Sequence, residues 1–308
     1  MPKKRRPLRS QRKRPKQAPR NPLSQRDRNT VRTMREIYPA AIIRQYRRAA
    51  LLIANGQFQE GVDVLLTISG DETDTLPLFT REKLTEVYLD HGVVHPALGP
   101  FSKADETDEP QEFVYYSCLA VAYGWRKQFD DARRIYAKRM QLLEQDEENL
   151  IETRMEIADT YRREGDLERA SEELEEIWAD APGYGAAGHE LALSYLRLDR
   201  KEDARGVYEQ IAAREGDDYQ GTALLALRRS EEALRVFQAE IERYTQDGFP
   251  PYLAALAHLQ LGDVPSARRR LVEALSKDPS MWDEEQQRFA QFALTPREFD
   301  TLAEIWPR

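Results

Sequence analysis

Apolar residues recur three and four positions apart through most of the chain beyond residue 35, whereas Gly, Pro and Asp fall mostly between those runs. This spacing places the apolar side chains on one face of a helix and predicts α-helices separated by short turns. We find no convincing alternation of apolar and polar residues combined with hairpin turns, which would indicate strands. The sequence therefore predicts an all-α protein.

The helical pattern repeats itself with a period of 34 residues. Small residues align with small residues and bulky ones with bulky ones, as expected where antiparallel helices interlock through complementary shapes. A period of this length is a sequence signature of stacked helical hairpins. The pairs 34 residues apart are Ala158 and Ala192, Tyr161 and Tyr195, Ala170 and Ala204, Leu174 and Tyr208, Ala233 and Ala267, and Phe237 and Leu271.

The turns between the helices follow a related pattern, seen best in Gly165-Asp-Leu-Glu-Arg-Ala170 and Gly262-Asp-Val-Pro-Ser-Ala267. Together with the alanines and aromatics, these turns make the chain resemble the tetratricopeptide repeat family over most of residues 42–282, in about six units. The resemblance implies a right-handed superhelical solenoid of helix-turn-helix repeats with a concave face. We expect the tyrosine stripe Tyr123, Tyr161 and Tyr195 to belong to its core.

We divide the chain into three parts. Residues 1–35 are expected to be a disordered basic arm, 36–282 the solenoid, and 283–308 a pair of C-terminal helices that cap the last repeat. The solenoid has an irregular insertion near residues 70–112, with a helix at about Thr80 to Asp90 and an acidic loop from His95 to Glu112. A shortened first helix is expected near residues 219–227. Thr295 and Glu298 form a predicted capping box.

The net charge of −8 conceals two opposite populations. Fourteen Lys or Arg and one acid, Asp27, lie between Met1 and Arg35, so this segment carries +13 and the other 273 residues carry −21. The segment contains five prolines before residue 23 and few large apolar side chains. Candidate polyanion-binding residues are Lys3, Lys4, Arg5, Arg6, Arg12, Lys13 and Arg14.

Three interpretations of the arm remain open. Its Lys and Arg side chains are suited to neutralise the phosphates of RNA or DNA without reading sequence. In a eukaryote the same residues would pass for a nuclear-import signal. Otherwise the arm solubilises the protein or folds back onto its acidic body. It has no interleaved aromatic residues, so base stacking is not implied.

The first helix of each repeat lines the concave face in this family, and side chains three or four apart point into the groove. Apolar anchors mixed with acids suit a peptide or a helix that carries basic residues. Some of these side chains are equally expected to contact neighbouring helices or the cap. The expected peptide-binding residues are Trp125, Met155, Asp159, Arg162, His189, Leu193, Leu196, Tyr252 and Leu256.

Relatives that bind chaperone tails use a clamp of Lys, Asn and Arg on this face. The matching positions here hold Met155, Asp159 and Glu190, which cannot form that clamp. His91 and His95 have the spacing of metal ligands, but Gly92 and Pro96 predict a helix end between them, and a surface loop is the better interpretation. Cys118 is expected to be a buried structural thiol.

We find no phosphate-binding glycine loop, nucleophile elbow or metal cluster, so we expect no enzyme, no cofactor and no bound metal. No apolar run approaches the roughly 20 residues of a membrane-spanning helix, and no secretory signal is recognised. The lone cysteine fits a reducing compartment, so we expect the cytoplasm, or the nucleus in a eukaryote. The expected function is an adaptor that captures a segment of another protein, and the alternative is a nucleic-acid-associated protein anchored by its arm.

Overall fold

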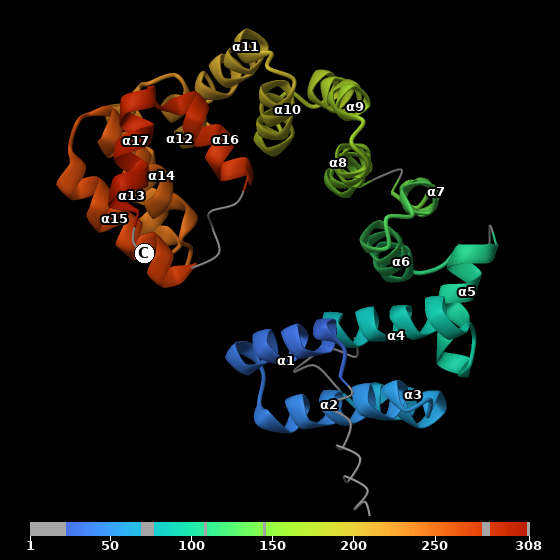
Figure 1. The fold of residues 1–308 in the computed structure, drawn as a ribbon. Helices are drawn as coiled ribbons and strands as arrows, with labels where there is room; N and C mark the ends of the chain where they lie inside the picture. Colours follow the sequence, from blue (N-terminus) through green and yellow to red (C-terminus); the bar gives the residue numbers. More distant parts are fainter. Residues whose placement is uncertain (1–22, 69–76, 108–109, 144–145, 279–283, 307–308) are drawn as a thin grey trace, which may run out of the picture. The chain divides into compact units, whose positions relative to one another are not determined.

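Every regular element in the described part of the chain is helical, and no β-strand occurs there, so the all-α prediction is confirmed. The chain divides into two compact units, residues 1–122 and 123–308, which we describe separately. No helix in these residues is both long and apolar enough to cross a membrane. The computed structural model describes residues 23–68, 77–107, 110–143, 146–278 and 284–306 (Figure 1).

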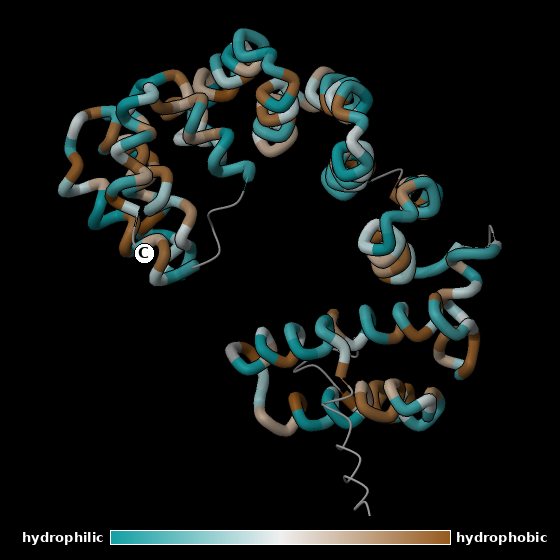
Figure 2. The backbone as a smooth tube through the Cα atoms, viewed as in Figure 1, coloured by the Kyte–Doolittle hydropathy of each residue, from teal (hydrophilic) through white to brown (hydrophobic). Residues whose placement is uncertain are grey.

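The first unit contains a helical hairpin with one further helix packed on each of its two helices. Helices α2 and α3 form the hairpin, and the tube over them carries apolar stretches (Figure 2). Helix α1 packs on α2, and α4 packs on α3. The elements are α1 (Gln25–Ile37), α2 (Ala40–Ala54), α3 (Phe58–Leu66), α4 (Leu78–His91), the 3-10 turn η1 (Pro96–Leu98), α5 (Gly99–Glu106) and α6 (Phe113–Trp125), which continues into the second unit.

Helix α1 begins inside the segment that we expected to be disordered. Ser24 caps the helix, accepting a hydrogen bond from the amide of Asp27, and Val31 and Met34 are buried. The expectation of disorder is therefore wrong from Gln25 onward, because this stretch has enough apolar side chains to pack on α2. The arm residues Lys3, Lys4, Arg5, Arg6, Arg12, Lys13 and Arg14 lie outside the described residues.

The insertion is more ordered than the sequence indicated. Helix α4 fits the expected helix at about residues 80–90, but the predicted acidic loop contains η1 and α5. Prolines in the first turn begin both elements. Phe101 is 1% exposed and packs edge-on against Tyr115, with ring centroids 5.0 Å apart. The loop prediction was wrong because one buried aromatic residue organises a short segment that looks polar.

The second unit consists of antiparallel helical hairpins in sequence order. Helix α8 pairs with α9, α10 with α11, α12 with α13 and α14 with α15. Helix α12 has only seven residues, as the shortened period predicted. The remaining elements are α7 (Phe129–Met140), α8 (Glu147–Glu164), α9 (Leu167–Asp180), α10 (Gly185–Arg197), α11 (Lys201–Ala212), α12 (Gln220–Ala226), α13 (Ser230–Arg243), α14 (Phe249–Gln260), α15 (Val264–Lys277), α16 (Glu284–Ala293) and α17 (Pro296–Ile305).

The repeating alanines and tyrosines form the core of these hairpins. Ala158, Ala192 and Ala204 are at most 1% exposed, and Tyr161 and Tyr195 are each 8% exposed. Close contact between two helices requires a small residue opposite a large one, which explains the 34-residue period. The core assignment of the tyrosine stripe is confirmed.

One backbone feature recurs at the turn between the two helices of each predicted repeat. A residue one or two positions after the end of the first helix has a positive φ of 58° to 99° in all six turns. This left-handed conformation favours glycine, yet three of the turns use a different residue. The six positions are Gly56, Lys127, Gly165, Asp199, Arg228 and Gly262.

The C-terminal helices form as predicted, but they do not only cover the end of the array. Thr295 and Glu298 make the predicted capping box at the start of α17. Helix α17 packs on α14, the first helix of the last repeat. Helix α16 reaches back onto the first helices of earlier repeats, α10 and α12 (Figure 1). The two helices therefore lie along the face that we expected to bind a partner.

Candidate functional site

An open groove of about 470 Å³ lies between α8 and α10, the first helices of two neighbouring repeats. Its apolar lining comes from Met155, Ala158, Leu174 and Ala186, with the ring of Tyr184 beside them. Met155 and Tyr184 are half-buried, so they are accessible to another molecule. Three residues predicted from the sequence line this groove: Met155, Asp159 and Arg162.

The charged lining of the groove is mostly acidic. Five carboxylates and two guanidinium groups reach it, namely those of Glu152, Glu156, Asp159, Glu190, Glu285, Arg162 and Arg197. Glu156 accepts a hydrogen bond of 2.6 Å from Nη1 of Arg139. Both arginines of the groove are already paired with acids. The remaining surplus of negative charge favours a cationic ligand.

A single carboxylate from the C-terminal helices joins the two groove arginines. Oε1 of Glu285 in α16 lies 3.1 Å from Nη1 of Arg162 in α8. The same oxygen accepts a hydrogen bond from Nη2 of Arg197 in α10. Arg162 also pairs with Asp159 on its own helix. This network ties α8, α10 and α16 together, and its members Arg162, Arg197 and Glu285 all line the groove.

Glu190 is the carboxylate that this network leaves out. Burial and the nearby Glu285 carboxylate raise its pKa above the ordinary range. In the described part of the chain it has no hydrogen bond or ion pair. An incoming Lys or Arg side chain would compensate its charge, which makes Glu190 the best-placed anchor for a basic residue.

Trp125 lies at the end of α6, the first helix of the preceding repeat. Its side chain is 67% exposed, although it is large and apolar. The guanidinium of Arg163 lies 5.6 Å from its ring centroid, and Nη2 of Arg163 donates to the carbonyl of Gly124 at 2.9 Å. An exposed tryptophan held by an arginine is typical of residues that anchor protein interfaces.

The remaining predicted groove residues are covered by the chain's own C-terminal helices. His189, Leu193, Leu196, Tyr252 and Leu256 are at most 8% exposed. The hydroxyl of Tyr252 donates to the carbonyl of Gln286 in α16 at 3.2 Å. We therefore correct the predicted site, because these five side chains pack into the core and do not line an open groove in this structure.

The apolar face of α16 contributes to this cover. Phe289, Ala290 and Ala293 are at most 4% exposed, and Phe289 lies edge-on to His189 with ring centroids 6.0 Å apart. His189 is within 3.2 Å of the Tyr208 hydroxyl. Burial, with a smaller contribution from Arg197, lowers the pKa of His189 to about 4, so the ring is neutral at physiological pH.

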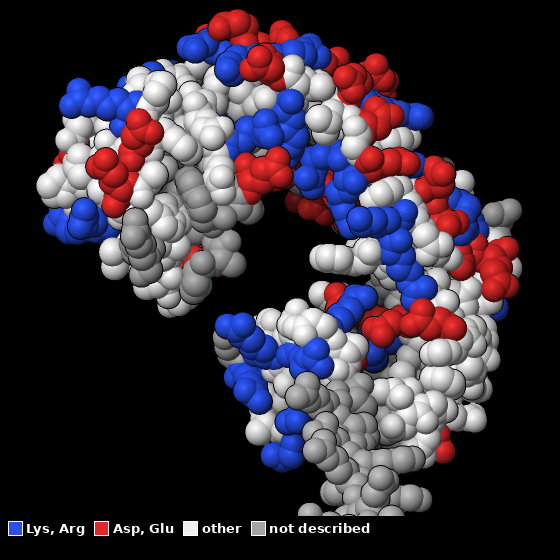
Figure 3. Space-filling model, in the orientation of Figure 1, with Lys and Arg blue, Asp and Glu red and all other residues white. Residues whose placement is uncertain are grey.

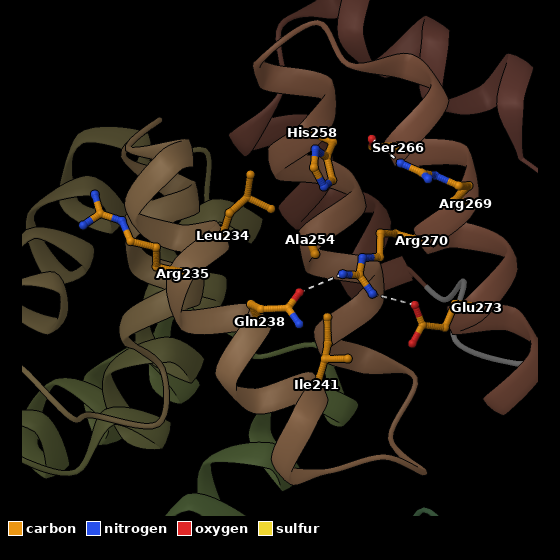
Figure 4. A pocket seen from close by; sticks show the side chains of 10 residues that line it. All are labelled: Leu234, Arg235, Gln238, Ile241, Ala254, His258, Ser266, Arg269, Arg270 and Glu273. Carbon is orange, nitrogen blue, oxygen red and sulfur yellow. Dashed lines mark hydrogen bonds and ion pairs between the residues drawn. The ribbon is translucent and has the colours of Figure 1, made fainter.

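A second pocket, of about 800 Å³, lies among α13, α14 and α15 (Figure 4). Arg270 reaches across it from α15, donating to Gln238 at 2.8 Å and to Glu273 at 2.7 Å. His258 lies on the α14 side. Burial lowers its pKa, and the charges of Arg270 and Arg269 act in the same direction. Because the Arg270 guanidinium in this pocket already bonds to Gln238 and Glu273, we interpret the pocket as part of the packing between repeats and not as a binding site.

The other candidates from the sequence have ordinary structural partners. Nε2 of His95 lies 3.1 Å from Asp63, whereas the ring of His91 stacks on Phe58, with centroids 3.9 Å apart. The two histidines therefore serve different neighbours. Among the described residues no group of three His, Cys, Asp or Glu is arranged to hold a metal ion. Cys118 is buried, and burial raises the pKa of its thiol, as expected for a structural cysteine.

Comparisons with known proteins support the repeat assignment. A family model described as tetratricopeptide repeat matches residues 161–228, from the end of α8 to the turn after α12. This match confirms the resemblance to tetratricopeptide repeats that the sequence indicated. No curated protein matches the chain.

Several solved structures are similar to part of the chain. A crystal structure of MamA protein has 20% sequence identity and a TM-score of 0.36, covering 60% of this chain and 98% of that one. TTC0263, a thermophilic TPR protein from Thermus thermophilus, has 19% identity and a TM-score of 0.40, covering 60% and 100%. YrrB, described as a TPR protein with an unusual peptide-binding site, has 17% identity and a TM-score of 0.37, covering 59% and 93%.

Proposed function

We propose that this chain is a non-catalytic scaffold that holds a peptide or helix of another protein in the groove between α8 and α10. The observation that carries the proposal is the open groove itself, which combines an apolar lining with a surplus of carboxylates. Such a site suits a partner segment with an apolar side chain next to a Lys or Arg. Trp125 would extend the contact toward the preceding repeat.

The proposed site is smaller than the groove expected from the sequence. The five buried residues are excluded from it, and Glu152, Tyr184 and Glu190 are added. Because Met155, Asp159 and Glu190 occupy the clamp positions of chaperone-tail receptors, the partner is not expected to bind through a C-terminal carboxylate. A free carboxylate would be repelled by Glu190 and its neighbours.

A photo-crosslinking experiment tests the site directly. The photoreactive residue p-benzoylphenylalanine would replace Met155 in the groove, and in a matched control it would replace Val272, which is 54% exposed on α15. We expect crosslinks to a discrete partner from position 155 but not from position 272. Equal crosslinking from both positions would show that the groove has no special role.

A substitution then tests the charge of the partner. Glu190→Lys would reverse the unpaired carboxylate, and Glu202→Lys makes the same change on the exposed surface of α11. We expect the first variant to lose the crosslinked partner and the second to keep it. If the Glu190→Lys variant kept the crosslinked partner, the proposal that the partner carries a basic residue at this site would be wrong.

The cytoplasmic location stays a prediction that imaging of the tagged full chain would check.

A further inference from the structure

The surface of α1 and α2 in the first unit is strongly basic. Side chains coloured as Lys or Arg gather over these helices in Figure 3. Every arginine of the two helices is exposed, and neither helix contains a lysine. The seven residues are Arg26, Arg28, Arg32, Arg35, Arg44, Arg47 and Arg48.

Among the described residues these arginines have no acidic partner, unlike several arginines of the second unit. None of the seven makes an ion pair with a described carboxylate, whereas Arg133, Arg154 and Arg229 in the second unit each have one. Helix α2 contains no acid. In α1 the carboxylate of Asp27 is used internally, since Oδ1 lies 2.9 Å from Nζ of the buried Lys83. The two helices carry seven arginines against two acids, Asp27 and Glu36, so the surface keeps an excess of positive charge.

The arrangement of the arginines fits a ligand with repeated negative charges. Arg28, Arg32 and Arg35 are four and three positions apart, so they share one face of α1. Arg44, Arg47 and Arg48 line a shallow depression of about 380 Å³ on α2. Guanidinium groups bind phosphate through two parallel hydrogen bonds, which makes arginine suited to a phosphate backbone. Residues 1–22, which precede the surface, add ten Lys or Arg and no acid.

The apolar residues of α1 argue against a membrane as the ligand. A helix that lies on a bilayer needs a free apolar face, but Val31 and Met34 are buried against the rest of the unit. Ile37 is the one large apolar side chain of α1 that is exposed. Aromatic residues that would stack on bases are also missing from the exposed surface, because Tyr46 is 2% exposed.

We infer that the α1–α2 surface binds the phosphate backbone of a nucleic acid without reading its sequence. This inference goes beyond the proposed scaffold function, and it does not depend on the groove between α8 and α10. Each arginine that contacts a phosphate releases counterions on binding, so the affinity must fall steeply with salt.

Fluorescence anisotropy of the full chain with a labelled 30-base-pair DNA duplex and a labelled 30-nucleotide RNA tests the inference. The variant combines Arg32→Gln, Arg35→Gln and Arg47→Gln, because these side chains make no described hydrogen bond. A control combines Arg205→Gln, Arg235→Gln and Arg268→Gln, exposed positions of the second unit with the same change in charge. Circular dichroism would check that both variants are folded.

We expect the first variant to raise the dissociation constant by about tenfold or more, with a log–log salt slope smaller by about 0.9 for each lost contact to duplex DNA. The dissociation constant of the control variant should stay within about twofold of the wild-type value, because its three arginines would affect binding only through the net charge of the protein. A similar loss in both variants would overturn the inference.

A deletion of residues 1–22 separates the helical surface from the preceding segment. In the shortened chain, residual binding should still fall when the three arginines are replaced. If the deletion alone abolishes binding and the arginine variant has no effect, the surface is not the site. Vesicles of phosphatidylserine and phosphatidylcholine provide the last comparison, since arginine-dependent binding to vesicles but not to nucleic acid would also overturn the inference.

Discussion

Lys83 and Asp27 form a buried ion pair, with Nζ and Oδ1 2.9 Å apart and both side chains at most 4% exposed. The hydroxyl of Tyr46 donates to the same carboxylate oxygen at 3.1 Å. This cluster joins α1 to α2 and α4. It adds a buried polar contact to the apolar packing of Val31 and Met34, and together they hold this arginine-rich segment on the unit.

Replacing Asp27 with Asn should unfold α1 and weaken the first unit. The change leaves Lys83 buried without its main partner, a situation that costs about 3 kcal/mol. Glu86 remains 2.9 Å from the same ammonium, so we expect the lower end of the usual range. Hydrogen exchange of the α1 amides and urea unfolding would measure the effect. Glu86→Gln is the control, and an equal loss in both variants would contradict the central role of Asp27.

The same pair should make the first unit sensitive to acid. Burial alone would raise the pKa of Asp27, but the hydrogen bonds and charge of Lys83, with Ser24 and Tyr46, hold it below the ordinary value of 3.8. A carboxyl with a lowered pKa in the folded state stabilises the protein above its unfolded pKa, and this contribution is lost as the pH falls through the lowered value. Unfolding below pH 4 should therefore be steeper for wild type than for Asp27→Asn.

The fold was predictable because its signals are local and repeated, whereas the covering of the groove was not. Ala158 and Ala192 recur at a fixed spacing, and each reports a close helix contact. Phe289 and Ala290 indicate only that α16 has an apolar face, and many neighbours could cover it. The pairs that determine its position, such as Glu285 with Arg197, join residues far apart in the sequence. Asp27 likewise looked like a lone acid in a basic arm, because its partner Lys83 lies in α4, three helices further along the chain.

His189 should make the second unit less stable as the pH falls from 6.5 to 4. Its pKa is lowered to about 4 by burial and by Arg197. Between pH 6.5 and 4 the histidine is therefore protonated in the unfolded chain but neutral in the folded chain. The full loss, reached at about pH 4, is about 3 kcal/mol. Glu240, whose pKa is raised to about 7 by burial, acts in the opposite direction. The difference between wild type and His189→Gln isolates the histidine, and parallel pH profiles would contradict this assignment.

Glu285→Gln should loosen α16 from the repeats. The Glu285 carboxylate pairs with Arg162 of α8 and Arg197 of α10, and Arg197 is only 9% exposed. Removing the carboxylate charge should therefore lower the free energy of unfolding by about 1–3 kcal/mol. Faster hydrogen exchange in α16 than in α14 would measure the loosening. Glu284→Gln is a matched control, because Glu284 is 86% exposed and pairs only within its own helix. If both variants exchange alike, the Glu285 network does not hold the helix.

The three turns without glycine should respond differently to the same substitution. A residue with a side chain loses about 1–2 kcal/mol of stability in the left-handed conformation, and glycine avoids this cost. The greater freedom of glycine in the unfolded chain offsets about 0.4–1 kcal/mol of that gain. Lys127→Gly, at an exposed position with φ of 59°, should therefore raise the free energy of unfolding by about 0.5–1 kcal/mol. Asp199→Gly should give less, because Asp tolerates this conformation better.

Arg228→Gly should have the opposite sign, although φ at this turn is 61°. The guanidinium of Arg228 makes two hydrogen bonds to Glu298, at 2.9 and 2.8 Å, and a third to the carbonyl of Ala293 at 3.1 Å. These bonds attach α16 and α17 to the α12–α13 turn, and their loss should exceed the relief of backbone strain. Urea unfolding of the three glycine variants would check the order. A stabilised Arg228→Gly protein would show that the C-terminal helices are held by their apolar faces alone.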